Sequence, residues 1–225
     1  LIRYWCIAYI FIFKGRDEMK PLFMWAGGKS KLIKHYKPHL PKEFNSYHEP
    51  FFGGGAMFFS KPPAKNEVIN DLNNNVVNFY EVLKLQFDRL KKLVDASLLS
   101  RKQFNHVLSV YRLQTDATNI ERAWAFWYVA NFSFANKIGG GLKYCADPNT
   151  HIPTALHNKK ERFTTDLVKR IENTTIENKC ALKVIESFNK PYVFRFIDPP
   201  YLNADQGHYK GYSEQDFINL LDKEN

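Results

Sequence analysis

The alternation of apolar and polar positions along the chain predicts short buried strands separated by helices. Residues 68–71 and 175–178 have the pattern of short strands, and residues 192–197 form a nearly continuous apolar run. Runs of this kind are typical of parallel strands that are buried on both faces. Helical spacing lies between them, so the pattern favours an α/β fold built on a parallel sheet.

Helical periodicity dominates the middle of the chain. Apolar residues at steps of three and four predict one long amphipathic helix over residues 76–94, and a second helix follows Ser100. Thr118 and Glu121 have the spacing of a capping box and predict the start of a third helix. We expect its large residues to lie in the core rather than to stack on bases: Ile120, Ala123, Trp124, Phe126, Trp127, Ala130 and Phe134.

Composition narrows the class of partner. The chain has 225 residues, of which 44% are hydrophobic, enough for one catalytic domain with an insertion. The formal net charge of +9 favours nucleic acid ahead of a membrane as partner, although a merely basic protein carries the same charge. The 3 cysteines form no CxxC pair, so we expect neither a disulfide framework nor a metal site.

Residues 1–18 differ in character from the rest of the chain. Within them, residues 1–13 are apolar and aromatic with one Arg, which is too short a stretch to span a membrane, and no small-residue cleavage site follows. Met19 then opens a stretch that resembles a natural beginning. We expect residues 1–18 to be an extension outside the fold and, since no transmembrane segment is evident elsewhere in the sequence, a cytoplasmic protein.

The motif Asp198-Pro199-Pro200-Tyr201 directly follows the apolar run at 192–197. Two consecutive prolines cannot continue a central strand, so we expect the strand to end there in a rigid bend. Open α/β sheets place their ligands at this carboxyl end of the strands. The bend would present one carboxylate, one fixed carbonyl and one aromatic ring to a ligand.

These three groups suit the chemistry of an exocyclic amino group on a nucleobase. Such an amine is a poor nucleophile because its lone pair is delocalised into the ring. A carboxylate and a carbonyl can accept both N–H hydrogens, which directs the lone pair toward an electrophile and stabilises the developing positive charge. An aromatic ring can stack on the base once the base has left the helix. An ordinary proline turn is the alternative interpretation.

Two glycine motifs and one acid precede this bend in the chain. Residues 25–29 read Trp-Ala-Gly-Gly-Lys, and residues 49–55 place three glycines between a short strand and an apolar helix. Glycine turns let a ligand approach the backbone, although they can simply be tight turns. Asp71 ends the strand at 68–71, where an acid typically binds the ribose of an adenosine-containing cofactor. A helix N-cap is the alternative role for Asp71.

Taken in order, the motifs WAGGK, EPFFGGG, NDLN and DPPY resemble the DNA adenine N6-methyltransferases of the Dam type, the alpha-ordered amino-methyltransferases. The resemblance implies a doubly wound, Rossmann-like methyltransferase sheet with an inserted helical target-recognition region. It implies S-adenosyl-L-methionine as cofactor and double-stranded DNA as partner. The implied reaction is site-specific methylation of adenine N6 in a flipped base, as in restriction–modification.

The same resemblance assigns residues to roles. The implied cofactor-binding residues are Trp25, Gly27, Gly28, Lys29, Phe51, Gly53, Gly55, Asp71 and Asp198. The implied catalytic residues are Asp198, Pro199, Pro200 and Tyr201. A polar loop at residues 203–212 is placed to close over the target base.

The resemblance also divides the chain. Residues 19–80 and 166–225 would form the catalytic domain that binds S-adenosylmethionine, and residues 81–165 the target-recognition insertion. Within the insertion, five basic residues are candidates for phosphate contacts, although a solvated basic face is an equal alternative: Lys137, Lys143, Lys159, Lys160 and Arg162. The family's sheet normally continues further, so we expect C-terminal strands to be missing and the activity of this chain to be reduced.

Other functions fit part of the pattern. Cytosine N4 methylation shares the geometry of the bend, RNA adenine methylation is open, and so is a truncated, inactive DNA-binding remnant. A dinucleotide oxidoreductase fits less well, because hydride transfer has no use for the groups of the DPPY motif. The sequence specifies neither the recognised DNA site nor an oligomeric state.

Overall fold

Four parallel strands form the centre of the molecule. The computed structural model describes residues 19–25, 27–41, 43–134, 137–143, 152–187, 190, 192–201 and 213–224. Among them, β1 (Ser46–Glu49), β2 (Asn66–Asn70), β3 (Thr174–Glu177) and β4 (Val193–Arg195) pair in the order β3-β2-β1-β4. His48 of β1 lies opposite Val68 of β2 and Arg195 of β4. The parallel pairing confirms the predicted α/β class.

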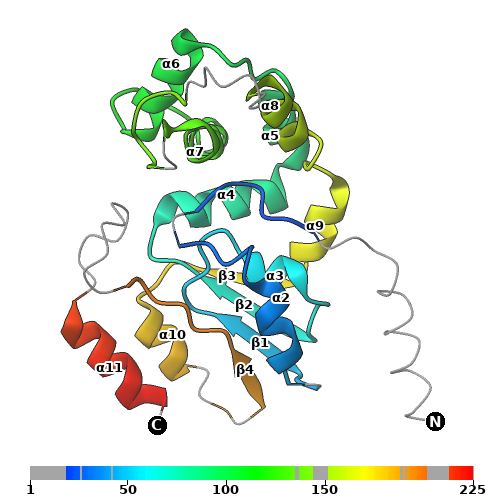
Figure 1. The fold of residues 1–225 in the computed structure, drawn as a ribbon, viewed down its shortest axis with the longest axis vertical. Coiled ribbons are helices and arrows are strands. Elements are labelled where there is room, and N and C mark those ends of the chain that lie inside the picture. The colour runs from blue at the N-terminus through cyan, green and yellow to red at the C-terminus, as the bar shows by residue number, and fades with distance from the viewer. Residues whose placement is uncertain are drawn as a thin grey trace.

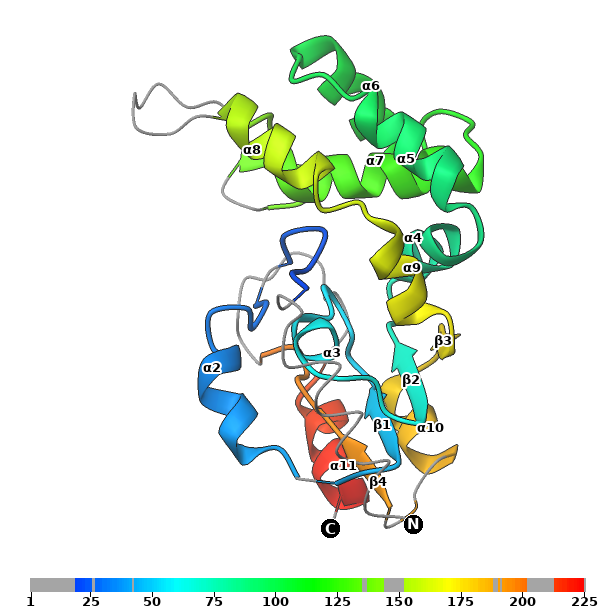
Figure 2. The ribbon, with the colours of Figure 1, turned by 90° about the vertical axis from the view of Figure 1, so that its right-hand side faces the viewer.

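The strand order makes the sheet doubly wound. The chain moves from β1 outward to β2 and β3, and then returns to place β4 on the other side of β1. Because crossovers between parallel strands are right-handed, this reversal puts the connecting helices on opposite faces. Helix α3 (Ala56–Ser60), which links β1 to β2, and helix α10 (Ala181–Ser187), which links β3 to β4, therefore lie on opposite faces of the sheet (Figure 1 and Figure 2). Doubly wound folds bind ligands at the reversal point, here between β1 and β4.

The other helices flank the sheet or stand above it. Before β1, α2 (Ile33–Tyr36) leads into a short 3-10 helix, η1 (Lys37–His39), and at the far end α11 (Glu214–Glu224) packs on α10. Figure 1 shows an upper helical part that α4 and α9 join to the sheet. Between β2 and β3 the chain forms α4 (Asn74–Leu85), α5 (Phe87–Asp95), α6 (Arg101–Tyr111), α7 (Asn119–Phe132), α8 (Ile152–Lys160) and α9 (Thr165–Ile171).

The single long helix predicted over residues 76–94 is wrong. The chain breaks at Gln86, whose φ of −139° and ψ of 38° are not helical, and continues as a separate helix, α5. Both α4 and α5 pack on α7, so apolar residues on each side of the break, such as Leu83 and Leu90, face the same core. The apolar periodicity of the sequence therefore continues across the bend at Gln86, and the pattern alone does not show that the helix breaks there.

Helix α7 is buried around almost its whole circumference. Thr118 and Glu121 form the predicted capping box at its start. The large residues from Ile120 to Phe132 are buried as expected, but Phe134 is 62% exposed, so its predicted place in the core is wrong. The helix ends at Phe132, and Phe134 lies just beyond Ser133, which forms an isolated antiparallel bridge with Leu142.

The apolar run at residues 192–197 is less buried than predicted. It is a strand only over Val193–Arg195, all of these residues are half-buried, and Tyr192 is 58% exposed. In the described part of the chain, β4 pairs with β1 on one side and with no strand on the other. An edge position leaves fewer side chains to cover a strand, which explains the exposure.

One hydrophobic core joins the sheet to the upper helices. Trp127 Nε1 and Asn131 Nδ2 of α7 both donate to the carbonyl of Leu22 at 3.1 Å, and Phe23 packs edge to face on Phe126. The segment before the WAGGK motif is thus fastened to the helical part, while the division at residues 81 and 165 remains a prediction. The extension at 1–18 and the loop at 203–212 lie outside the described residues. None of the helices described is long and apolar enough to cross a membrane.

Candidate active site

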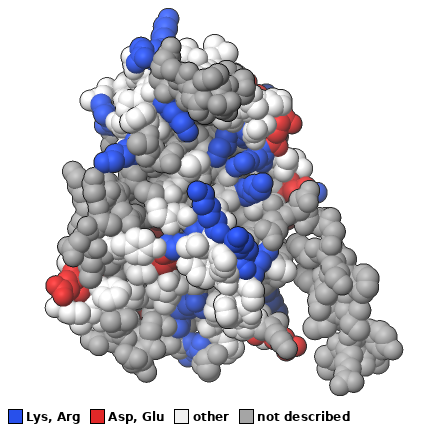
Figure 3. Space-filling view, viewed as in Figure 1, with Lys and Arg blue, Asp and Glu red and all other residues white. Residues whose placement is uncertain are grey.

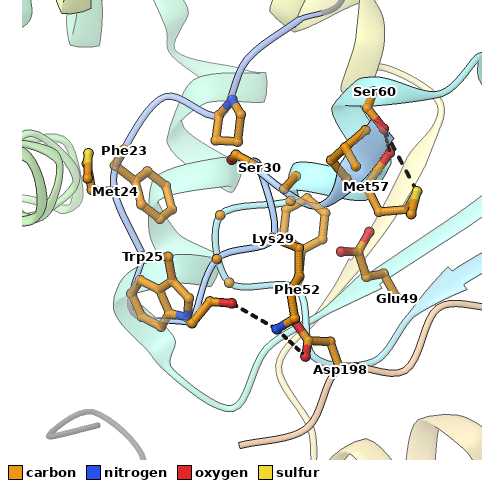
Figure 4. Close-up of a pocket in the computed structure, with 18 of the residues that line it drawn as sticks. Phe23, Met24, Trp25, Lys29, Ser30, Glu49, Phe52, Met57, Ser60 and Asp198 are labelled. Carbon is orange, nitrogen blue, oxygen red and sulfur yellow. Dashed lines mark hydrogen bonds and ion pairs between the residues drawn. The ribbon is translucent and has the colours of Figure 1, made fainter. Parts of the chain in front are cut away.

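A cavity of about 410 Å³ opens at the carboxyl ends of β1 and β4. Figure 4 shows Trp25, Lys29 and Asp198 toward one end of it, and Met57 and Ser60 toward the other. Three sequence motifs that are far apart in the chain meet here. The predicted site residues that line the cavity are Trp25, Gly27, Gly28, Lys29, Phe51, Gly53, Gly55, Lys159, Arg162, Asp198, Pro199, Pro200 and Tyr201.

Asp198 is paired with the ammonium group of Lys29. The Lys29 Nζ lies 2.6 Å from both carboxylate oxygens of Asp198, 2.8 Å from the carbonyl oxygen of Gly27, and 4.8 Å from the centre of the Tyr201 ring. A carboxylate, a carbonyl and an aromatic face thus surround one nitrogen. Asp198 and Tyr201 are two of the three groups that the sequence predicted for holding an amine, whereas the carbonyl at this nitrogen is that of Gly27 and not the predicted carbonyl of Pro199.

The charge of this nitrogen is stabilised by its neighbours. Burial lowers the pKa of Lys29, but hydrogen bonds and charge from Asp198 and Tyr201 outweigh that effect, and the net pKa lies above its ordinary value. The group at this position is therefore a cation at neutral pH. The Asp198 carboxylate therefore favours a positively charged nitrogen at this position.

The glycine turn after β1 forms one wall of the cavity. Gly53 and Gly55 have φ angles of +49° and +65°, the left-handed region that favours glycine. A Cβ atom on Gly53 would lie 2.6 Å from Trp25 Cδ1, and one on Gly55 would lie 2.4 Å from Phe52 Cζ. The bare backbone lets aromatic rings of two motifs pack directly against the turn.

Asp71 supports this turn from behind. Its carboxylate accepts from the Gly53 N–H at 2.7 Å and from the Asn73 N–H at 2.8 Å, and burial raises the pKa of Asp71 to about 6. It is not among the residues that line the cavity. The N-cap of α4 is Asn73, whose side chain accepts from the Asn75 N–H. Ribose binding by Asp71 remains a prediction.

Glu49 is a cavity residue to which the sequence analysis gave no role. It ends β1, only 3% of it is exposed, and its Oε2 accepts from the Tyr47 hydroxyl at 2.7 Å. Burial, together with the charge of Asp198, raises the pKa of Glu49 to about 8, against the opposing effects of Tyr47 and Lys61. The rule that drew attention to Asp71, an acid at the end of a strand, applies equally to Glu49 and would have found it.

The predicted basic residues fall into different surroundings. Lys159 and Arg162 line the cavity, and burial with the nearby charges of Arg162 and Lys143 lowers the pKa of Lys159 to about 8. Lys160 instead donates to the carbonyls of Asp95 and Ser97, both at 2.7 Å, and so ties α8 to the end of α5. Lys137 and Lys143 follow α7, where their backbone N–H groups donate to the carbonyls of Phe134 and Phe132. Figure 3 shows Lys and Arg side chains in a band that runs from the helical part down the centre of one face.

The site contains no evident metal centre. Across the described residues, no group of three or more His, Cys, Asp or Glu side chains could hold a metal ion. The polar groups that line the cavity are carboxylates, basic side chains and the bare backbone of the glycine turn.

Comparison with known proteins places this site in a family. Residues 25–222 match the family described as D12 class N6 adenine-specific DNA methyltransferase. The type II methyltransferase M1.LlaDCHI of Lactococcus lactis subsp. cremoris is 25% identical, over 93% of this chain and 77% of its own. The type II methyltransferase M.MjaIII of Methanocaldococcus jannaschii is 26% identical, over 89% of this chain and 75% of its own. A DNA adenine methylase of Serratia marcescens is 31% identical over 47% of this chain and 39% of its own. Because the family match spans most of the chain and its motifs meet at one cavity, the chain belongs to the D12 class N6 adenine-specific DNA methyltransferases.

Proposed function

We propose that this chain uses S-adenosyl-L-methionine to methylate N6 of an adenine that is flipped out of double-stranded DNA at a specific site. The observation that carries the proposal is the position of the Lys29 ammonium between the Asp198 carboxylate, the Gly27 carbonyl and the Tyr201 ring. An amine that attacks a methyl group gains positive charge. A site built to hold a cationic nitrogen is therefore suited to the transition state of that attack.

The cavity fits the proposed cofactor in size and in character. Its volume of about 410 Å³ is within the usual range of small-molecule sites. When bound, S-adenosyl-L-methionine supplies a methyl group on a positively charged sulfonium. Gly53 and Gly55 offer bare backbone for close approach, and Glu49 offers a buried acid for positive charge. The other residues that we propose to hold the cofactor are Trp25, Gly27, Gly28, Lys29, Phe51, Asp71 and Asp198.

The residues of the DPPY motif would act on the target base. Asp198 and the carbonyl of Pro199 accept the two N–H hydrogens of the adenine amine, which directs its lone pair away from the ring. Tyr201, half of whose surface is exposed, stacks on the flipped base. The amine takes the place of the Lys29 ammonium at Asp198, so Lys29 must withdraw as the base enters.

One experiment tests the proposal and its alternatives. DNA is incubated with the protein and the cofactor, and its nucleosides are identified by mass spectrometry. N6-methyladenine is the expected product. N4-methylcytosine would move the assignment to the alternative amino-methyltransferase reaction, and methylation of RNA alone would change the substrate. Cofactor binding without any methylated product would favour an inactive DNA-binding remnant.

DNA binding should depend on Lys159 and Arg162 at the rim of the cavity. The logarithm of the DNA-binding constant falls as the logarithm of the salt concentration rises. We expect Lys159→Ala and Arg162→Ala each to make this fall less steep, by about one unit of slope, because each removes one phosphate contact. Fluorescence anisotropy of a labelled duplex over a salt series measures the slope. A slope unchanged in both variants would remove these residues from the DNA surface.

Lys160→Ala is the matched control for Lys159→Ala. The two lysines are neighbours on α8 and their loss changes the net charge equally, but the Lys160 ammonium binds the carbonyls of Asp95 and Ser97. Its replacement should lower the melting temperature and leave the salt slope unchanged. The reverse pattern would show that Lys160 contacts DNA and that Lys159 does not.

A further inference from the structure

The wall behind the cavity contains a buried network of charged side chains that the proposed reaction does not use. Lys61, which follows α3, pairs with Glu67 of β2, and both side chains are almost fully buried. Arg170 of α9 donates to Glu67 Oε1 at 3.1 Å and to the carbonyl of Phe58 at 2.8 Å. Buried ion pairs seldom add net stability over apolar residues, because desolvation offsets their attraction. A role in function would account for the burial of these charges.

Tyr47 connects the network to the cavity. The Lys61 Nζ lies over its ring, 3.8 Å from the centroid, and its hydroxyl donates to Glu49 Oε2 at 2.7 Å. Side chains two residues apart in a strand share one face of the sheet, so β1 places Tyr47 directly beside Glu49. Tyr47 is fully buried, and its hydroxyl has its hydrogen bond to the one carboxylate that faces the cavity from β1.

We propose that Tyr47 is a positioning residue for cofactor binding: its hydroxyl fixes the Glu49 carboxylate where that group meets the positively charged methionine end of S-adenosyl-L-methionine. This inference rests on the proposed function, in which that cofactor occupies the cavity. Lys61, held by Glu67, keeps the Tyr47 ring in place through its contact with the ring face. Lys61 and Glu67 thus act on the orientation of Glu49 through Tyr47.

The arrangement predicts a pH dependence for cofactor binding. Glu49 is faced by Tyr47 from β1, by Lys61 and the Phe58 N–H from the α3 side, by Asp198 after β4, and by Tyr80 of α4. Burial raises its pKa to about 8, so the carboxylate that attracts a cation forms as the pH rises through that value. Cofactor affinity should therefore increase as the pH approaches that value, and fall again at higher pH where the ammonium group of the cofactor loses its proton. The Tyr47 hydrogen bond lowers the pKa of Glu49, so losing the hydroxyl should move this rise to higher pH.

Tyr47→Phe tests the proposal, because it removes only the hydroxyl. Calorimetric titration with S-adenosyl-L-methionine from about pH 6 to about pH 9 should show affinity weakened about 10-fold at neutral pH, because loss of the hydroxyl disfavours the carboxylate form of Glu49 and leaves less of it to meet the cofactor. The rise of affinity with pH should also shift upward. Tyr80→Phe is the matched control, because within the described residues the buried Tyr80 hydroxyl has no hydrogen-bond partner. It should leave both the affinity and the pH profile unchanged.

A test in a second variant distinguishes a role of Tyr47 in positioning Glu49 from a role in packing the core. In a Glu49→Gln variant, adding Tyr47→Phe should have no further effect on affinity, because the two changes act through one interaction. An equal effect with and without Glu49, or a lower melting temperature with unchanged affinity, would overturn the proposal. Failure of the unaltered protein to bind the cofactor at any pH would refute the proposed function instead.

Discussion

Asp198→Ala should abolish measurable methyl transfer while leaving the protein folded. Asp198 is the carboxylate that meets a cationic nitrogen at the cavity, with both oxygens 2.6 Å from Lys29 Nζ. Loss of a preorganised group that stabilises charge in a transition state commonly costs about 10²–10³ in rate. Transfer of a tritiated methyl group to DNA measures the effect, and turnover near that of the unaltered protein would remove Asp198 from its assigned role.

Asp198→Ala needs a control, because it removes the carboxylate that pairs with the Lys29 ammonium. The Lys29 side chain is only 10% exposed, so without Asp198 its ammonium keeps the Gly27 carbonyl but loses its counter-charge. Removing one partner of a buried pair destabilises a protein because the other charge stays desolvated. Adding Lys29→Met to Asp198→Ala should therefore restore the melting temperature but not the turnover. If turnover returned with the melting temperature, Asp198 would matter for folding alone.

The sequence predicted which motifs meet at one cavity better than it predicted the ends of the helices. The position of DPPY followed from two prolines after an apolar run, and glycine turns after strands are strongly constrained by backbone geometry. In a parallel sheet the carboxyl ends of the strands share one edge, so motifs at the ends of β1 and β4 had to meet. Local chemistry and sheet topology together were enough to bring Gly53 and Asp198 to one cavity.

Features that depend on packing in three dimensions were not predictable in the same way. Gln86 interrupts a helix whose apolar stripe continues unbroken, because α4 and α5 both pack on α7. Lys159 and Lys160 are adjacent and chemically identical, yet one lines the cavity and the other binds backbone carbonyls. The hydrogen bond from Tyr47 to Glu49 depends on the orientation of two buried side chains that composition does not encode.

A substitution in the glycine turn is expected to have the other large effect, a loss of cofactor affinity. Gly55→Ala should reduce cofactor affinity by on the order of 100-fold, because the turn or the Phe52 ring must shift to make room for the new Cβ atom. The left-handed backbone adds a cost of roughly 1–2 kcal/mol, which lowers the stability of the fold. The φ of Gly55 is +65°, and the new Cβ would lie 2.4 Å from Phe52 Cζ. Phe52 lines the cavity, so moving its ring or the backbone of the turn changes the cofactor surface directly. Calorimetric titration and a thermal melt measure affinity and folding separately.

Gly54→Ala is the matched control, because it adds the same methyl group one residue earlier in the same turn. The nearest atom to a Cβ at Gly54 is Trp25 Cβ at 3.5 Å, an ordinary contact, and Gly54 is not among the residues of positive φ. Affinity and melting temperature should therefore stay close to those of the unaltered protein. Equal losses in the two alanine variants would mean that the turn resists any side chain, and that neither the left-handed backbone at Gly55 nor its contact with Phe52 shapes the cofactor site.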